Sequence, residues 1–452
     1  MPWLLVPGLL AATATTGAGT AAADENPQLP GGATAAFGGL GTYGQAVVRE
    51  DGEARTIPAG LFEMSVDGGG TLKTYGIDID NPTQPDAQYR EAPWSATSLQ
   101  ANKQAGKIHW ILRHSYPQVN DLAELARKAK APGLTEADAA AGTQVAIWRQ
   151  SDGVDVSAAD PQAERLADFL ERSARALAEP KASLTLDPPA VSGKAGERVG
   201  PVTVRTGARG VTVGPPVDAA ASGVEVVGED GRPLTSAADG SRLYFDVPED
   251  SAGSAVLTVQ ASTSVPVGRA FVAQTRSQTQ VVAGSSESTV SATATVAWAE
   301  QGPVPALSAE RNCAKGGVDV TAANRGDQDF RFSLLGVKYT IPAGRVRTVT
   351  IPLQEDQAYD FTITGPHGIA ERFQGVLDCR TKASEPVDGI APQLAPSPAT
   401  AGGAGASSHD LAETGSSDAT PVIAAVAVGF LVVGGLVVFL LRRKGAPEDG
   451  AE

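Results

Sequence analysis

The chain has 452 residues, with 51 acidic and 36 basic side chains and a formal net charge of −15 at pH 7. This length allows two to four domains, and the acidic balance, with no basic patch outside the C-terminal tail, argues against a nucleic-acid partner. Aromatic residues make up only 5% of the chain, which fits β-rich extracellular modules better than an aromatic-lined catalytic pocket.

The first 23 residues indicate an export signal. They are apolar and then small, and Ala21-Ala22-Ala23 before Asp24 fits an A-x-A cleavage site, although the segment has no Lys or Arg at its start. We therefore predict a signal peptide over residues 1–23.

Residues 24–180 predict an α+β domain that begins with strands and continues with helices. Glycine and proline punctuate the strand-like runs. These runs cover residues 42–50, 60–67 and 72–80.

Three helices are expected in the second half of this domain. One begins near Val119. The next has Thr135 as its N-cap and reaches about Arg149, and the last has Asp160 as N-cap with Pro161 in the first helical position.

Two motifs in this domain resemble those of the thioester domains of Gram-positive surface adhesins, and the resemblance spans roughly residues 36–178. Residues 74–83 read TYGIDIDNPT and residues 143–146 read TQVA. In that family a cysteine after the tyrosine attacks the carboxamide of the TQxA glutamine, ammonia leaves, and the resulting thioester can acylate an amine. The resemblance makes Gln144 the glutamine, with Thr143 and Ala146 completing its motif.

The cysteine position of this motif is occupied by Gly76, and no cysteine precedes Cys313. The resemblance therefore implies a retained fold without the crosslinking reaction. An ester from Thr74 or Tyr75 to Gln144 is a weaker alternative, because neither hydroxyl has an evident adjacent base. The favoured interpretation of TQVA is a helical turn with local hydrogen bonds.

Asp78 and Asp80 follow the same strand at spacing i, i+2, which would place them on one face. This spacing could indicate a metal site or an acid pair. Solvated carboxylates at the edge of a loop are the favoured interpretation. No metal site is expected, because the chain has two cysteines and scattered histidines, and no cofactor is expected either.

Two β modules are expected next. Residues 181–300 contain about seven short alternating runs separated by turn signals, which indicates an immunoglobulin-like sandwich. Residues 301–382 predict a second, smaller sandwich. Cys313 and Cys379 lie near the two ends of this module and, in an exported chain, are expected to form a disulfide; two buried free thiols are the alternative.

The C-terminal part predicts an anchor. Residues 383–410 are rich in Pro, Ala, Gly and Ser and predict a disordered linker. Residues 421–441 carry no charge and, as a helix of about 31 Å, could cross a bilayer once. The following residues Arg442, Arg443 and Lys444 place the tail on the cytoplasmic side.

Residues 411–452 resemble the cell-wall sorting signal of Gram-positive surface proteins, in the LAxTG form read by actinobacterial sortases. The motif consists of Leu411, Ala412, Glu413, Thr414 and Gly415. The resemblance implies cleavage after the threonine and transfer of its carboxyl to a cell-wall amine, so that a sortase and peptidoglycan are the expected partners. A simple single-pass anchor with a chance LAETG is the alternative.

The sequence thus predicts a multidomain, exported surface protein at the cell wall or the outer face of the membrane. We expect an adhesin or surface-interaction protein with an unknown surface ligand and no enzymatic activity. A structural cell-envelope spacer and an envelope-tethered enzyme are the alternatives, and the enzyme is disfavoured because no Ser-His-Asp, zinc or phosphate-loop pattern is present.

Overall fold

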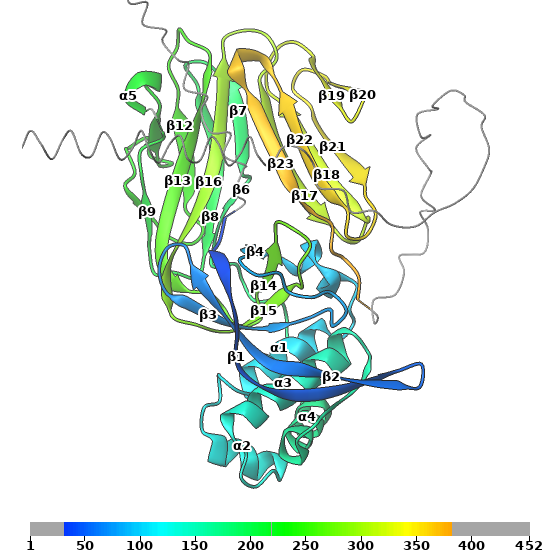
Figure 1. Ribbon diagram of the computed structural model, residues 1–452. Coiled ribbons are helices and arrows are strands. Elements are labelled where there is room, and N and C mark those ends of the chain that lie inside the picture. The colour runs from blue at the N-terminus through cyan, green and yellow to red at the C-terminus, as the bar shows by residue number, and fades with distance from the viewer. Residues whose placement is uncertain (1–30, 218, 382–452) are drawn as a thin grey trace, which may run out of the picture. The chain divides into compact units, whose positions relative to one another are not determined.

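The computed structural model describes residues 31–217 and 219–381 (Figure 1). Within this part of the chain no helix is long and apolar enough to cross a membrane. The predicted signal peptide, linker, sorting motif and membrane span lie outside the described residues.

The N-terminal domain is built on a seven-stranded sheet in the order β2-β3-β15-β14-β4-β1-β5. Because β1 also pairs with β2, six of these strands close on themselves and β5 extends from β1. The strands are β1 (Thr34–Glu50), β2 (Glu53–Val66), β3 (Thr71–Gly76), β4 (Gln88–Ala92), β5 (Asp155–Ala158), β14 (Ala270–Ala273) and β15 (Gln280–Ser285).

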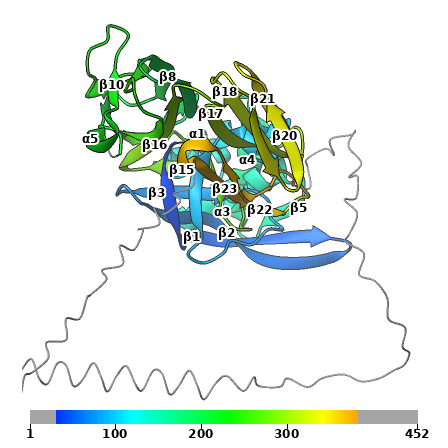
Figure 2. The same ribbon diagram turned by 90° about the horizontal axis from the view of Figure 1, so that it is seen from above.

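A two-residue turn joins the long strands β1 and β2, whose hairpin runs along the lower edge of the coloured part of Figure 2. Glu50 pairs with Glu53, and the two residues between them have positive φ, 51° at Asp51 and 85° at Gly52. Asp-Gly is the dipeptide that a type I′ turn favours, and this turn matches the right-handed twist of the strands.

Four helices gather on one side of the β1–β2 hairpin (Figure 1). Thr135 and Asp138 form a capping box at the start of α3, and Asp160 caps α4 ahead of Pro161. The predicted starts of α3 and α4 are therefore confirmed, whereas α1 was not predicted. The helices are α1 (Ala105–His114), α2 (Leu122–Ala129), α3 (Glu136–Ser151) and α4 (Pro161–Ser173), with short 3₁₀ turns η1 (Trp94–Ala96) and η2 (Ser98–Gln100).

The second module is a β-sandwich in which a four-stranded sheet, β10-β12-β8-β6, and a five-stranded sheet, β11-β9-β13-β16-β7, share one hydrophobic core. A short helix, α5 (Ala219–Ser222), lies beside it. The strands are β6 (Leu184–Asp187), β7 (Ala190–Lys194), β8 (Arg198–Thr206), β9 (Val211–Val213), β10 (Glu225–Val227), β11 (Ser236–Ala237), β12 (Arg242–Asp246), β13 (Gly253–Ser264) and β16 (Glu287–Ala299).

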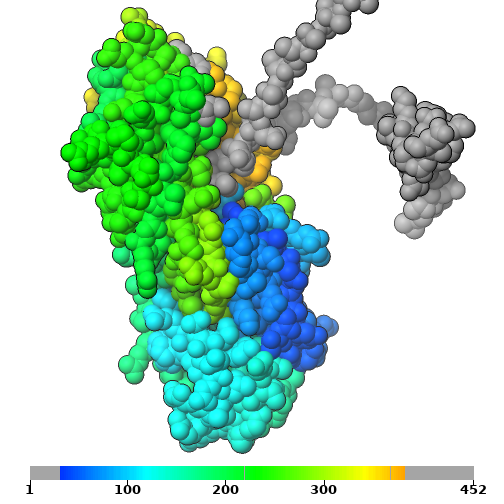
Figure 3. All heavy atoms as spheres, turned by 90° about the vertical axis from the view of Figure 1, so that its left-hand side faces the viewer, coloured from blue at the N-terminus to red at the C-terminus, as the bar shows by residue number. Residues whose placement is uncertain are grey.

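The predicted boundary between the first two domains is wrong at one place. The hairpin β14–β15 lies inside the range 181–300 assigned to the sandwich, yet it pairs with β3 and β4 of the N-terminal sheet. Figure 3 shows this lime-green segment beside the blue N-terminal strands. The hairpin thus leaves the sandwich to complete the N-terminal sheet, and the chain then returns to the sandwich as β16. Tyr89, Phe271 and Val282 of the N-terminal sheet belong to the same core cluster as the sandwich.

The third module has three small sheets around one core. Cys313 and Cys379 form the expected disulfide, with their Cα atoms 5.2 Å apart. The strands are β17 (Pro305–Asn312), β18 (Gly317–Asn324), β19 (Phe330–Leu334), β20 (Val337–Ile341), β21 (Val346–Pro352), β22 (Ala358–Thr364) and β23 (Ala370–Val376), with a 3₁₀ turn η3 (Pro366–Gly368).

Candidate functional site

Gly76, which occupies the cysteine position of the motif, is buried and is the last residue of β3. Its strand pairs with β15, where Gln280 lies opposite Gly76. The strand partner of the motif therefore comes from a hairpin about 200 residues further along the chain.

Gln144 reaches the same place from α3. Its Oε1 accepts a hydrogen bond from the backbone N–H of Gly76 at 3.1 Å, and its Nε2 donates to the carbonyl of Gly76 at 2.8 Å. The structure thus brings the two motifs together, and the interpretation of Gln144 as a locally bonded residue is wrong. Thr143 does bond locally, since its Oγ1 donates to the carbonyl of Ala139 at 2.7 Å.

The position of Gln144 depends on close packing of α3. A Cβ at Gly142 would lie 2.4 Å from the carbonyl oxygen of Ala163 in α4, so the glycine permits the two helices to approach. Ala146, the last residue of the TQVA motif, is fully buried in the core between the helices and the sheet. Small residues around Gln144 therefore set the depth at which its carboxamide meets β3.

A second glutamine faces Gly76 more directly. A Cβ built on Gly76 would lie 1.9 Å from Oε1 and 2.4 Å from Cδ of Gln278. The Gln278 carboxamide occupies the space of a side chain at position 76, while both polar atoms of the Gln144 carboxamide are bonded to the backbone. A side chain at position 76 would therefore contact Gln278, whereas the Gln144 carboxamide is bonded to the backbone of the same residue. Gln278 was not predicted as a site residue; its sequence signal is the run SQTQ at 277–280.

The two hydroxyls considered for an ester bond have other partners. Thr74 Oγ1 donates to Oε1 of Gln280 at 2.9 Å, and the Tyr75 hydroxyl donates to the carbonyl of Tyr116 at 2.8 Å. Burial raises the pKa of the Tyr75 hydroxyl, so its phenolate is disfavoured. Neither hydroxyl is arranged to attack Gln144.

Three carboxyl groups lie close to the glutamines. Asp78 has a positive φ of 71° beyond the end of β3, so the expected common strand face for Asp78 and Asp80 is wrong. Burial, followed by the charges of Asp378 and Asp152, raises the pKa of Asp78 to about 8. Asp80 is exposed and pairs with Arg55 at 3.2 Å.

The other two carboxyls bind the backbone and side chains around the site. Asp152 accepts from the N–H of Ile79 at 3.1 Å, and Asp378 accepts from Thr279 Oγ1 at 2.8 Å. Burial raises the pKa of both Asp152 and Asp378 to about 6. Over the described residues no group of three His, Cys, Asp or Glu side chains has an arrangement that could hold a metal ion.

The third module reaches this site through its C-terminal segment. In addition to the contact of Asp378, Thr381 Oγ1 donates to the carbonyl of Ser151 at 2.6 Å. The backbone N–H of Cys313 donates to the carbonyl of Ser95 at 3.1 Å. The disulfide therefore lies between two contacts with the N-terminal domain, and the segment 377–381 borders the glutamine site.

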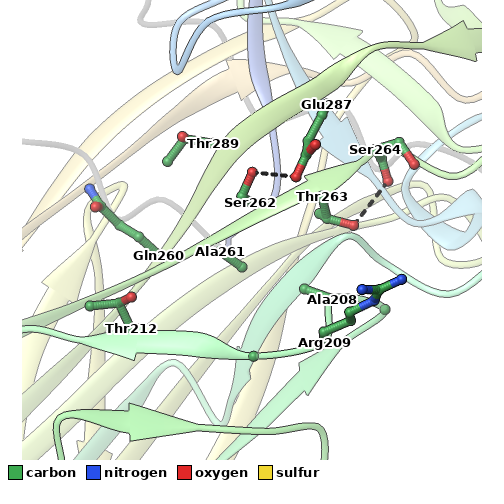
Figure 4. Close-up of a pocket in the computed structure, with 12 residues that line it drawn as sticks. Ala208, Arg209, Thr212, Gln260, Ala261, Ser262, Thr263, Ser264, Glu287 and Thr289 are labelled. Atoms are coloured by element: carbon green, nitrogen blue, oxygen red, sulfur yellow. Dashed lines mark hydrogen bonds between the residues drawn. The ribbon is translucent and has the colours of Figure 1, made fainter.

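A separate groove of about 850 Å³ lies on the sandwich (Figure 4). Strand β9 pairs with β13 only at Val259 and Gln260, so the loop 207–210 diverges from the last residues of β13. Ser262 donates to Glu287 at 2.8 Å on one wall, and Arg209 stands on the other. The groove offers hydrogen bonds to a polar ligand and was not predicted; its sequence signals are the runs TGARG and ASTS.

Comparison with known families identifies the first domain. The family described as "Thioester domain" matches residues 73–177, and the family described as "Bacterial phospholipase C, C-terminal domain" matches residues 304–376. The segment 73–177 is thus a thioester domain, as the resemblance implied. The match includes Gly76 and Gln144 and ends before the sandwich and Gln278. No curated protein matches the chain.

Solved structures with low similarity include three thioester proteins, each 14% identical to this chain. The Bacillus anthracis TIE protein covers 77% of this chain with a TM-score of 0.28, and this chain spans only 64% of that protein. The thioester domain of the Enterococcus faecium TIE86 protein aligns over 61% of this chain and 99% of its own length, with a TM-score of 0.29. The thioester domain of the Staphylococcus aureus TIE protein aligns over 59% and 98%, with a TM-score of 0.24.

Proposed function

We propose that this chain is a sortase-anchored surface protein whose thioester domain binds without forming the internal thioester. The observation that carries the proposal is Gly76, which lies between two glutamines in a thioester domain although no cysteine precedes Cys313. Thioester domains are typical of surface-attached, adhesin-like proteins. The chain would act at the cell wall or the outer face of the cell membrane, as an adhesin or surface-interaction protein and not as an enzyme.

The non-covalent part of the proposal follows from the chemistry at position 76. A thioester needs a thiolate within bonding distance of a carboxamide, and glycine supplies no nucleophile. The surface ligand would then be held by reversible contacts, for which the groove beside Arg209 offers hydroxyl and charged groups. The sortase and peptidoglycan would supply the covalent link at Thr414.

Two measurements test this function. The Thr414→Ala chain should lose its wall-linked fraction, while Ser416→Ala, next to the motif, should remain wall-linked. The intact mass of the wild-type chain should show no loss of about 17 Da, the ammonia that a thiol–carboxamide condensation releases. A wall-linked Thr414→Ala chain would contradict the anchoring, and an ammonia deficit would contradict the non-covalent binding.

A structural spacer and an envelope-tethered enzyme remain as alternatives from other classes. If the chain is a structural spacer, cells carrying it should bind no more surface ligand than cells without it. The match over 304–376 to a phospholipase C C-terminal domain makes a phospholipid substrate the first to assay for the enzyme. Turnover that a single substitution abolishes would favour the enzyme over the binding protein.

A further inference from the structure

A cavity of about 110 Å³ lies between the thioester domain and the third module. One wall is formed by β4 and β14, which carry Arg90 and Val272, and the other by β17, β22 and β23, which carry Arg311, Tyr359 and Phe373. The cavity is distinct from the glutamine site and from the groove on the sandwich. Its volume matches a small polar group more closely than a peptide segment or a sugar chain.

Strand alternation separates the two charged residues of β4. Glu91 is buried on one face, where its Oε1 accepts from Nε of Arg269 at 2.8 Å. Arg90 therefore projects from the opposite face, away from that ion pair. Its Nε is buried without a hydrogen-bond partner, and no ion pair within the described residues includes Arg90.

A second cation, Arg311, lines the same cavity. Burial raises the pKa of Asp378 and the charge of Arg311 opposes that rise, but the two side chains form no ion pair within the described residues. Arg311 donates from Nη1 to the carbonyl of Val376 at 3.0 Å and takes part in no ion pair among residues 31–217 and 219–381. Burial, followed by the charge of Arg311, lowers the pKa of Arg90 to about 10. Two like charges are thus held near each other in a partly desolvated space, which costs stability unless an anion joins them.

The remaining charged groups of the cavity do not supply that anion. Glu91, which also lines it, is paired with Arg269. Arg372 is paired with Asp360, with its Nη2 2.6 Å from Oδ2. Glu310 lines the wall but forms no ion pair with either arginine within the described residues, and burial, with the charges of Asp187 and Asp319, raises its pKa.

We propose that Arg90 and Arg311 form a binding site for a small oxyanion, a carboxylate or a phosphate group, at the junction of the thioester domain and the third module. The guanidinium groups would supply charge-assisted hydrogen bonds to its oxygens, and Tyr359 would close one side of the cavity. Because the walls come from two modules, the bound anion would also hold them together. The site does not depend on the proposed function of the thioester domain.

The test uses the purified full chain with inorganic phosphate or acetate as the probe and sodium chloride at matched ionic strength. Isothermal titration calorimetry and the midpoint of thermal unfolding are measured for the wild type, Arg90→Met, Arg311→Gln and the control Arg331→Gln, an exposed arginine on β19. Saturable binding is expected in the wild type and the control. Loss of one guanidinium should weaken it about tenfold or more, the effect of one charge-assisted hydrogen bond.

A second readout separates a binding residue from a structural one. In buffer without oxyanions, Arg90→Met should be at least as stable as the wild type, because the substitution removes a desolvated charge that has no partner. The site is supported if the probe raises the stability of the wild type but not that of Arg90→Met or Arg311→Gln. Tighter binding of phosphate than of acetate would assign the ligand to phosphoryl groups, and the reverse order to carboxylates.

The proposal is overturned if neither probe binds saturably at tens of millimolar, or if both arginine variants bind as the control does. It is equally overturned if Arg90→Met is unstable in oxyanion-free buffer and Arg311→Gln keeps wild-type affinity, since the arginines would then serve the fold alone.

Discussion

A cysteine introduced at position 76 should react with Gln278. The Cβ of Gly76→Cys would lie 1.9 Å from Oε1 and 2.4 Å from Cδ of Gln278. Non-bonded atoms do not approach this closely, so the carboxamide must either rotate away or accept the sulfur as a covalent partner. The backbone at this residue does not require glycine, because Gly76 is not among the described residues with positive φ.

The cost of rotation can be judged from the contacts of Gln278. Its Nε2 donates to the carbonyl of Asp78 at 2.7 Å, and this bond would be lost. One neutral hydrogen bond contributes about 1 kcal/mol, and overpacking in a buried site costs about 1–3 kcal/mol. In the covalent alternative the thiolate attacks Cδ, the C–N bond breaks, and ammonia leaves with the proton of the thiol, so the mass falls by about 17 Da.

Intact-mass analysis of four variants tests this assignment. Gly76→Cys should show the ammonia deficit and incorporate methylamine, while the matched control Gly76→Ser should do neither. The deficit should persist in Gly76→Cys with Gln144→Glu and disappear in Gly76→Cys with Gln278→Glu, because glutamate has no ammonia to release. The opposite pattern would make Gln144 the reacting residue, and no deficit in any variant would refute the inferred geometry.

Three further predictions concern stability. Glu91→Gln should lower the free energy of unfolding by roughly 1.5–3 kcal/mol in urea titrations, because the buried Arg269 would lose one of its two carboxylate partners and keep only Glu179; an unchanged midpoint would contradict this. Because the pKa of Asp78 is raised to about 8 and that of Asp378 to about 6, the folded state binds protons more tightly than the unfolded one. The contribution of these two protonated carboxyls to the free energy of unfolding is present below about pH 4 and should be lost as the pH rises through 6 and 8. Asp78→Asn should flatten this pH profile of stability. A rise in stability over this range would refute the prediction. Cys313→Ser should cost about 2–5 kcal/mol in guanidinium unfolding, and equal stability of the reduced and oxidised wild type would count against it.

The sequence alone predicted elements whose signals are local. The starts of α3 and α4 followed from Thr135 and Asp160, because a capping side chain bonds to backbone groups only two or three residues away. The disulfide followed from the presence of only two cysteines. The thioester motifs were recognisable because each is a short continuous run.

Tertiary structure alone decided which glutamine faces position 76. Gln278 arrives on a hairpin that leaves the sandwich, joins β3 and β4, and returns, and no local periodicity shows that two strands belong to a sheet begun about 200 residues earlier. The same limit applies to the cavity, since Arg90 and Arg311 lie on separate modules and meet only after both have folded. Local hydrogen bonds can be inferred from neighbouring residues, whereas strand pairing and the burial of a charge depend on the long-range packing of the whole chain.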